Sequence, residues 1–218
     1  MQSTYLPPMK LTIFGATGRT GQLLVKQALE AGHELTLYVR NPNAITLVDI
    51  NLKVVRGDLS NKVQLTEVIA GADACISVLG GNSLTKHATE LCNGVENIVS
   101  VMETCGVKRF IYLSSLGAGE SKHLMPAFAR FLIVILLLRI PLQDHTRNQQ
   151  VIAQSKLQWT ILQPGGLTDN VLTGVYKSGS GIVPIKGNPA ISRANVAHFI
   201  LAEAVQNKFI GNEVWLYE

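Results

Sequence analysis

The sequence has few of the residues that mark disulfide-rich or metal-binding proteins. Its 218 residues include three cysteines, Cys75, Cys92 and Cys105, and no C-x-x-C pair. An odd number of widely spaced cysteines argues against a disulfide scaffold and a zinc site, so we expect reduced thiols in a cytoplasmic protein. The five histidines show no metal-ligand spacing, and no metal site is predicted.

Charged and aromatic residues are also sparse. Charged residues make up 16% of the chain and aromatic residues 6%, and the net charge of +4 is spread without a block rich in Lys or Arg. This pattern argues against binding to nucleic acid, although a small positive excess suits an anionic ligand. A hydrophobic content of 47% is typical of a globular protein with a proper core.

Long hydrophobic runs are missing as well. The longest notable run, "FLIVILLL" from Phe131 to Leu138, is closed by Arg130 and Arg139. A membrane-spanning helix needs about 20 residues, so we expect this run to form a buried helix, a pocket wall or a subunit contact instead. The first residues lack the features of a signal peptide, and we interpret 1–8 as a flexible lead before a single domain over 9–218.

Strand-like apolar runs alternate with helical patterns along the chain. Near-continuous hydrophobic strands with helices between them indicate an α/β fold, a doubly wound parallel sheet of the Rossmann type with a small C-terminal substrate-side portion. The expected strands lie within 10–16, 34–40, 52–58, 73–80, 109–115 and 158–166, and the expected helices span about 20–31, 62–70, 84–105 and 143–155.

Each expected strand ends in a small or polar group. Ligands of doubly wound sheets bind beyond the carboxyl ends of the strands, which lie along one edge. The sequence therefore predicts one cleft lined by these ends: Gly15, Arg40, Asp58, the pair Gly80–Gly81, the pair Ser114–Ser115 and the pair Gly165–Gly166.

The first strand runs into a glycine-rich loop that opens a helix. Its sequence is Gly15-Ala16-Thr17-Gly18-Arg19-Thr20-Gly21. Gly15 permits a tight turn, Gly18 lets a pyrophosphate approach the backbone, and Gly21 lets the helix pack against the sheet. The helix start offers unpaired N–H groups and a favourable dipole for phosphates, so the loop predicts a bound dinucleotide.

Arg40 and Arg19 favour NADP(H) over NAD(H). An acidic residue at the end of the second strand would bind the ribose 2′-hydroxyl of NAD, but this strand ends in Arg40. A guanidinium suits a 2′-phosphate, and Arg19 at the helix start is a second candidate cation. Asp58 either caps the next helix or binds the adenine amino group. We also place Leu59, Leu79, Gly80 and Gly81 against the cofactor.

Motifs along nearly the whole chain resemble one family. From Lys10 to Tyr217 the sequence contains "GATGRTG", "VRN", "SVLG", "LSS", "WTILQPGGLTD" and the more selective "DHTR". Together these are similar to the atypical short-chain dehydrogenases/reductases, the NAD(P)-binding group related to NmrA that includes flavin and biliverdin reductases. The resemblance implies an NADPH-dependent reductase of flavin (FMN), biliverdin or a quinone-like acceptor.

The resemblance also implies roles for particular residues. Ser114 and Ser115 fall at the family's active-site serine, and His145 falls at a histidine near the substrate. The segment 164–167 falls on the loop beside the nicotinamide, with Pro164, Gly165 and Gly166 toward the cofactor and Leu167 toward the substrate. The Tyr-x-x-x-Lys pair of carbonyl-reducing relatives is missing, which argues against ordinary ketone chemistry.

Several of these assignments have a purely structural alternative. Ser114 and Ser115 could cap a strand end, His145 could lie on a helix surface, and Arg147 could face solvent instead of a substrate phosphate. Phe128 is expected in an apolar wall of the substrate pocket, and we interpret Asp144 as a helix cap. The missing Tyr-x-x-x-Lys also fits a non-catalytic NADP(H)-binding redox sensor, regulator or assembly factor, as a monomer or homodimer.

Overall fold

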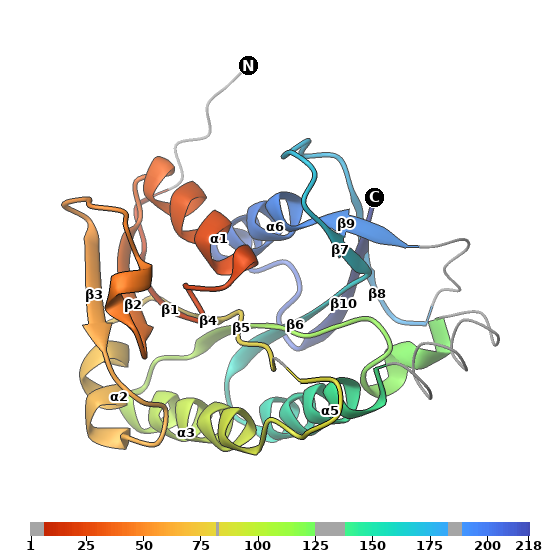
Figure 1. Cartoon of the computed structure of the whole chain (residues 1–218), viewed down its shortest axis with the longest axis horizontal. Coiled ribbons are helices and arrows are strands. Elements are labelled where there is room, and N and C mark those ends of the chain that lie inside the picture. The colour runs from red at the N-terminus through yellow and green to blue at the C-terminus, as the bar shows by residue number, and fades with distance from the viewer. Residues whose placement is uncertain (1–6, 82, 125–137, 183–188) are drawn as a thin grey trace.

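A central sheet lies between two layers of helices (Figure 1). The computed structural model describes residues 7–81, 83–124, 138–182 and 189–218. In these residues the main sheet has eight strands in the order β3-β2-β1-β4-β5-β6-β10-β8, and β7 and β9 form a separate pair. The strands are β1 Lys10–Phe14, β2 Glu34–Val39, β3 Leu52–Arg56, β4 Ala74–Ser77, β5 Arg109–Leu113, β6 Gln158–Pro164, β7 Gly166–Thr168, β8 Lys177–Ser180, β9 Ala190–Ser192 and β10 Asn212–Tyr217.

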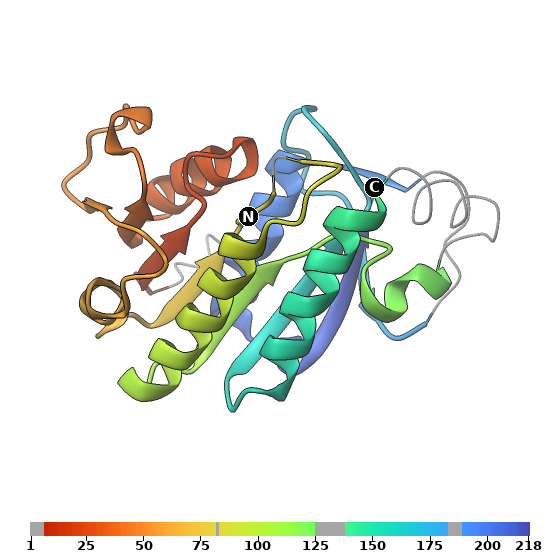
Figure 2. The ribbon, with the colours of Figure 1, turned by 60° about the horizontal axis from the view of Figure 1, so that its bottom comes forward.

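Two helical layers cover the faces of the sheet. Helices α1 (Arg19–Glu30) and α6 (Arg193–Gln206) pack on one face, where Leu24 and Ile200 join a core with Ile13 of β1. The other face carries α2 (Lys62–Ile69), α3 (Thr89–Cys105) and α5 (Arg139–Gln154), which Figure 2 shows in front of the sheet. Short 3₁₀ turns η1 (Pro42–Ala44) and η2 (Gly119–Leu124) complete the described elements.

The sheet has its switch point beside β1. This strand pairs in parallel with β2 on one side and with β4 on the other, so the chain order reverses there. All strands except β8 run parallel to their neighbours in the main sheet, and β8 pairs antiparallel with β10. Consequently the carboxyl ends of β1, β2, β3, β4, β5 and β6 share one edge, as the sequence predicts.

The sequence missed the strands that follow β6. After β6 the chain forms the β7–β9 pair and adds β8 and β10 to the main sheet, so the C-terminal part extends the same sheet. Strands β7 and β9 have three residues each and β8 is Lys-Ser-Gly-Ser, so pattern reading has little to detect in them. Strand β10 is different, because its sequence Asn-Glu-Val-Trp-Leu-Tyr contains an apolar run that the prediction overlooked.

Two helix boundaries also differ from the prediction. The helix expected from Leu84 begins at Thr89, and the one expected from Gln143 begins at Arg139. Pro141 lies in the first turn of α5, where its missing N–H breaks no helical hydrogen bond, so it does not delay the helix. Phe128, the segment 131–137 and residues 1–6 lie outside the described residues.

Candidate functional site

A cleft of about 800 Å³ opens at the carboxyl ends of β1, β2, β3 and β4, against the start of α3. Eight of the residues predicted to bind a cofactor line it: Gly15, Thr17, Arg40, Asp58, Leu59, Leu79, Gly80 and Gly81. Gly18, Arg19, Thr20 and Gly21 form the adjoining turn and first turn of α1. The cleft therefore gathers residues from four strand ends that lie far apart in the sequence.

The glycines of the turn differ in what a side chain would meet. Gly15 has φ +88°, and a Cβ there would lie 2.8 Å from the backbone carbon of Val78. A Cβ at Gly21 would strike the backbone of Gly15 and Ala16. At Gly18 the nearest atom is the Gly15 oxygen at 3.4 Å, so the protein itself leaves room there. The first and third glycines thus shape the turn, while Gly18 faces open space.

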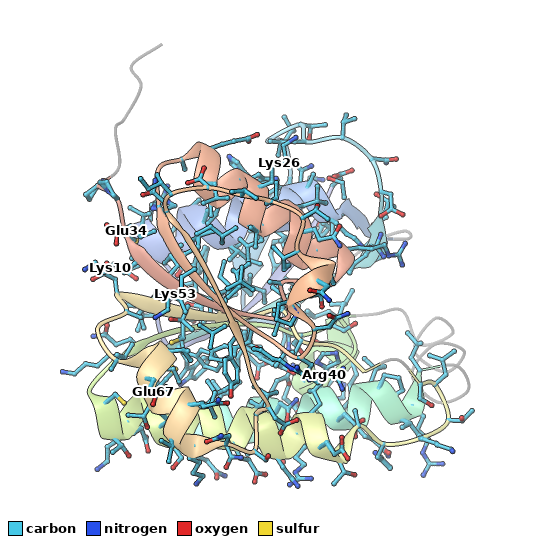
Figure 3. All side chains as sticks on the ribbon, turned by 60° about the vertical axis from the view of Figure 1, so that its left-hand side comes forward. Lys10, Lys26, Glu34, Arg40, Lys53 and Glu67 are labelled. Atoms are coloured by element: carbon cyan, nitrogen blue, oxygen red, sulfur yellow. The ribbon has the colours of Figure 1, made fainter. Side chains whose placement is uncertain are left out.

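Arg40 and Asp58 stand at the rim of the cleft. Arg40 is exposed just beyond β2, at the opposite end of that strand from Glu34 (Figure 3), and forms no ion pair within the described residues. Hydrogen bonds from the hydroxyl and the N–H of Ser60, together with the charge of Arg40, lower the pKa of Asp58. The cap of α2 is Asn61, whose side chain accepts from Gln64 N–H, so the prediction that Asp58 caps this helix is wrong.

Arg19 pairs with a carboxylate that is 150 positions away in the sequence. Its Nη1 lies 3.1 Å from Oδ2 of Asp169, in the loop after β7, and Oδ1 of Asp169 lies 2.6 Å from Nη1 of Arg193. Arg193 begins α6 and is largely buried. The carboxylate of Asp169 thus ties the starts of α1 and α6 together and balances the cation at the start of α1.

The sequence missed the part of the cleft that α3 provides. Tyr38 and Val39 from the end of β2 line the cleft, and so do His87, Ala88, Thr89 and other residues of the α3 start as far as Asn97. Gly94 lets α3 approach, because a Cβ there would fall within 2.6 Å of the Leu59 side chain. A glycine inside an expected helix is the signal that could have indicated this close contact.

His87 and Asp144 form a pair where α3 meets α5. The Nδ1 of His87 lies 2.6 Å from Oδ1 of Asp144, and Oδ2 accepts a hydrogen bond of 2.8 Å from Ala88 N–H. Asp144 is the sixth residue of α5, so the prediction that it caps its own helix is wrong. It binds the backbone at the start of α3 instead, where a negative charge suits the helix dipole.

The predicted serines lie beyond β5, outside the residues that line the large cleft. The hydroxyl of Ser114 is buried and accepts a hydrogen bond of 2.7 Å from Nε2 of Gln149. Ser115 is half-buried, and its hydroxyl is 3.3 Å from the carbonyl oxygen of Leu116. Ser114 is thus held by α5, while Ser115 keeps the more accessible hydroxyl.

His145 points into the protein rather than outward. Its Nδ1 lies 2.9 Å from the hydroxyl of Tyr112, and this hydroxyl also accepts a hydrogen bond of 2.9 Å from Nδ2 of Asn148. Burial lowers the pKa of His145 to about 4 and raises the pKa of Tyr112 above its usual range. The ring of His145 is therefore neutral at physiological pH, and the surface alternative for this histidine does not hold.

The remaining predicted residues lie at separate places. Pro164 ends β6, Gly165 and Gly166 follow it, and Leu167 is 37% exposed on β7; none of them lines the large cleft. Arg147 forms an exposed ion pair of 2.7 Å with Glu96 of α3. The roles of this loop and of Arg147 toward a cofactor or substrate therefore stay predictions.

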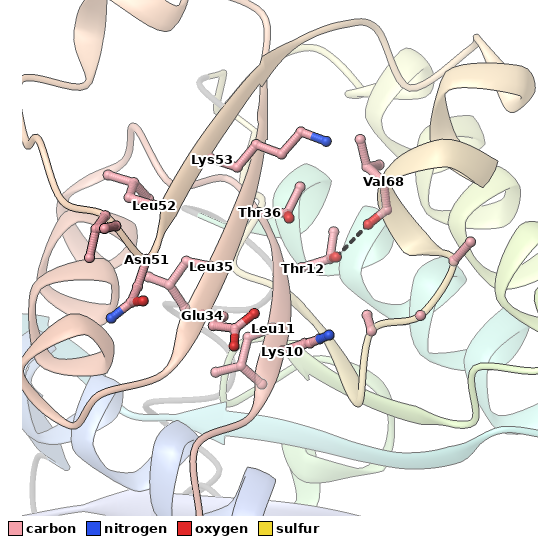
Figure 4. A pocket seen from close by; sticks show the side chains of 14 residues that line it. Lys10, Leu11, Thr12, Glu34, Leu35, Thr36, Asn51, Leu52, Lys53 and Val68 are labelled. Carbon is pink, nitrogen blue, oxygen red and sulfur yellow. Dashed lines mark hydrogen bonds between the residues drawn. The ribbon is translucent and has the colours of Figure 1, made fainter.

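A smaller pocket of about 290 Å³ lies at the opposite, amino ends of β1, β2 and β3 (Figure 4). Thr12, Thr36 and Lys53 lie side by side on the three strands, and the hydroxyl of Thr12 donates to the carbonyl of Val68. This end of the sheet is where the short α2 stops. The pocket stands away from the carboxyl edge where doubly wound sheets bind ligands.

Among the residues that the structure describes, no group of three or more His, Cys, Asp or Glu side chains is placed to hold a metal ion. No helix in that part of the chain has the length and apolar character needed to cross a membrane.

Comparisons with known proteins agree with this geometry. The chain is 25% identical over 188 residues to photosystem II assembly factor Ycf39 of Synechocystis, covering 84% of this chain and 51% of that protein, so it spans about half that relative's length. A short-chain dehydrogenase/reductase from Veillonella parvula, solved in complex with NADP, is 20% identical with a TM-score of 0.79, covering 96% of this chain and 94% of that one.

ChuY of Escherichia coli O157:H7, described as an anaerobillin reductase, is 22% identical with a TM-score of 0.78, covering 96% of this chain and 97% of that one. At such identities the two solved structures show the shared Rossmann fold. A family model described as NAD(P)H-binding matches residues 15–207. Since this match takes in most of the chain, the protein belongs to the NAD(P)H-binding family.

Proposed function

We propose that the protein is an NADPH-dependent reductase that passes a hydride to a conjugated acceptor such as FMN, biliverdin or a quinone. The observation that carries this proposal is the exposed guanidinium of Arg40 at the rim of the cleft, with no ion-pair partner among the described residues. It lies where an acidic residue would bind the ribose of NAD, and its donors suit a 2′-phosphate.

The residues of the cleft fit this cofactor. Open space above Gly18 leaves room for a pyrophosphate beside the N–H groups at the start of α1. Asp58 offers an ionised acceptor for an adenine amino group, and Gly80 and Gly81 leave the backbone after β4 accessible for the riboses. When bound, the nicotinamide supplies a hydride.

The choice of acceptor follows from the side chains at hand. No tyrosine in the sequence is followed by lysine at the fourth place, so the usual acid for a developing alkoxide is missing. A conjugated acceptor spreads the incoming negative charge over its ring system and needs mainly orientation. The description of ChuY as an anaerobillin reductase supports an acceptor of this class.

A second candidate is a non-catalytic NADP(H)-binding protein that acts through a partner. Its support is the loop after β7, which exposes Val171 by 77%, Leu172 by 46% and Val175 by 76%. The buried side chain of Asn195 accepts from the N–H groups of Thr173 and Gly174, so the loop is held while its apolar side chains face outward. The Synechocystis relative is described as an assembly factor.

The deciding experiment is NADPH oxidation by the purified protein with FMN, FAD, biliverdin and quinones as acceptors. We expect saturable oxidation with at least one acceptor and much slower oxidation with NADH. Tight NADPH binding without turnover of any acceptor would instead favour the second candidate. Absence of both binding and turnover would contradict both.

A further inference from the structure

The structure assigns a proton-donating role to His87, which the sequence gives no function. This inference rests on the proposed function, because reduction of the acceptor adds a proton as well as a hydride. We propose that the imidazolium Nε2–H of His87 supplies that proton and that Asp144 positions the ring.

The first support is the place of His87 in the cleft. His87 lines the same cleft as Gly15, Arg40 and Gly80, on the wall that the start of α3 provides. Its side chain is 54% exposed, so a proton given up to a ligand can be replaced from water. None of the other histidines is among the residues that line this cleft.

The second support is that hydrogen bonds fix the orientation of the His87 ring. A carboxylate only accepts hydrogen bonds, so at 2.6 Å the Nδ1 of His87 donates to Oδ1 of Asp144. Asp144 is itself fixed, because its side chain is only 14% exposed and its other oxygen accepts from Ala88 N–H. With Nδ1 held in this way, Nε2 is the nitrogen left to meet a ligand.

The third support is that the neighbouring histidine is unsuitable. His145 is next to Asp144 in sequence, but its Nδ1 is bound to the buried Tyr112 hydroxyl and burial lowers its pKa to about 4. It therefore carries no extra proton to give at neutral pH. Consecutive residues of α5 thus have different partners, because Asp144 holds a cleft histidine and His145 bonds to the buried Tyr112 hydroxyl.

The proton balance of the step is simple. The Nε2–H bond of His87 breaks, and its proton bonds to the acceptor atom that gains negative charge from the hydride. His87 is then neutral, its Nδ1–H still donates to Asp144, and solvent returns a proton to Nε2. Such general acid assistance contributes about 10²- to 10⁴-fold in enzymes, and a conjugated acceptor should need the low end.

The charges around His87 come from α5, from the start of α3 with the segment before it, and from the ends of β2 and β3. Asp144 faces the ring from α5, while Lys86 precedes it in its own segment and Glu90 follows in the first turn of α3. Arg40 and Asp58 line the same cleft beyond the ends of β2 and β3. The pH profile of the wild type is therefore compared with that of Asp144→Asn. This substitution removes the nearest charge and keeps an acceptor for Ala88 N–H.

The test is the pH profile of kcat for NADPH oxidation, with the best acceptor of the panel, for wild type, His87→Gln and Asp144→Asn. We expect His87→Gln to lower kcat by about 100-fold and to lose the alkaline fall of the wild type, with the NADPH Kd within about twofold. Asp144→Asn should move that fall to lower pH. His198 lies on α6, outside the cleft, and bonds to the hydroxyl of Tyr176. His198→Gln is therefore the matched control.

A measurement without turnover separates folding from chemistry. In ¹⁵N spectra of histidine side chains in the free protein, we expect the signal of a protonated Nδ1 for His87, and we expect the best acceptor of the panel to shift the Nε2 signal when it is added with NADPH. Wild-type turnover with an unchanged profile in His87→Gln would overturn this inference alone. No turnover by the wild type with any acceptor would overturn the proposed function and, with it, this role.

Discussion

Replacing Gly18 with valine should separate cofactor binding from folding. Gly18 has φ −75° and ψ 163°, which other residues adopt, and a Cβ there would meet only the Gly15 oxygen at 3.4 Å. The free energy of unfolding should therefore change by no more than about 1 kcal/mol, mostly through the poorer helix cap. For a chain of this length, that is a Tm change of up to about 4 °C.

The same valine should remove nucleotide binding. Its methyl groups occupy the open space beside the start of α1 where the pyrophosphate is expected. We expect the Kd of NADPH and of NADH to rise at least about 100-fold, which corresponds to about 2.7 kcal/mol. Isothermal titration measures the Kd, and thermal unfolding followed by circular dichroism measures Tm.

Gly21→Ala is the matched variant with the opposite expectation. A Cβ at this position would lie 2.8 Å from the Ala16 Cα, and backbone cannot yield as a flexible side chain can. We expect a loss of about 1–3 kcal/mol of stability, the range for overpacked sites, and a clear fall in Tm. The reasoning would be refuted if Gly18→Val bound NADPH within about threefold of wild type, or if Gly21→Ala unfolded at the wild-type temperature.

Two further predictions concern stability. Glu203→Gln removes the negative charge that lies 2.7 Å from the buried Arg109 guanidinium. The unfolding free energy should fall by about 3–5 kcal/mol and Tm by about 6–20 °C, because the guanidinium loses its compensating charge. A fall in Tm under about 2 °C would show that the pair contributes little. The pKa of His145 is about 4 in the folded protein and 6.5 in the unfolded chain. Between these pH values the unfolded chain binds more protons than the folded protein. The free energy of unfolding therefore falls by about 3 kcal/mol as the pH drops from 6.5 to about 4. His145→Gln should flatten this part of the curve of urea unfolding against pH, and parallel curves for the two proteins would contradict the burial argument.

The sequence predicted what depends on local pattern. The glycine-rich turn, the strands up to β6 and the polar ends of those strands are local signals, and a parallel sheet brings those ends to one edge without further information. Five of the eight predicted residues that line the cleft follow from this rule: Gly15, Arg40, Asp58, Gly80 and Gly81. The ends of β5 and β6, which the rule placed in the same cleft, do not line it. The fold class is confirmed for the same reason.

Long-range contacts of single side chains were beyond such reasoning. His87 and Asp144 are 57 positions apart, and nothing in the sequence pairs them. Likewise Arg19 has an expected phosphate partner by motif, yet it contacts Asp169 at a separation of 150 positions. The neutral state of His145 depends on its burial against Tyr112, which periodicity in α5 does not reveal.

The central claim is that Arg40 makes this cleft a site for NADP(H), and the most direct test is the Kd of NADPH and of NADH for wild type and Arg40→Ala. Arg19→Ala, which removes a guanidinium already bound to Asp169, is the matched control and should change the NADPH Kd less. We predict that Arg40→Ala raises the Kd of NADPH at least tenfold, or about 1.4 kcal/mol, and leaves that of NADH within about twofold. Equal losses for the two nucleotides would contradict the assignment of Arg40 to the 2′-phosphate.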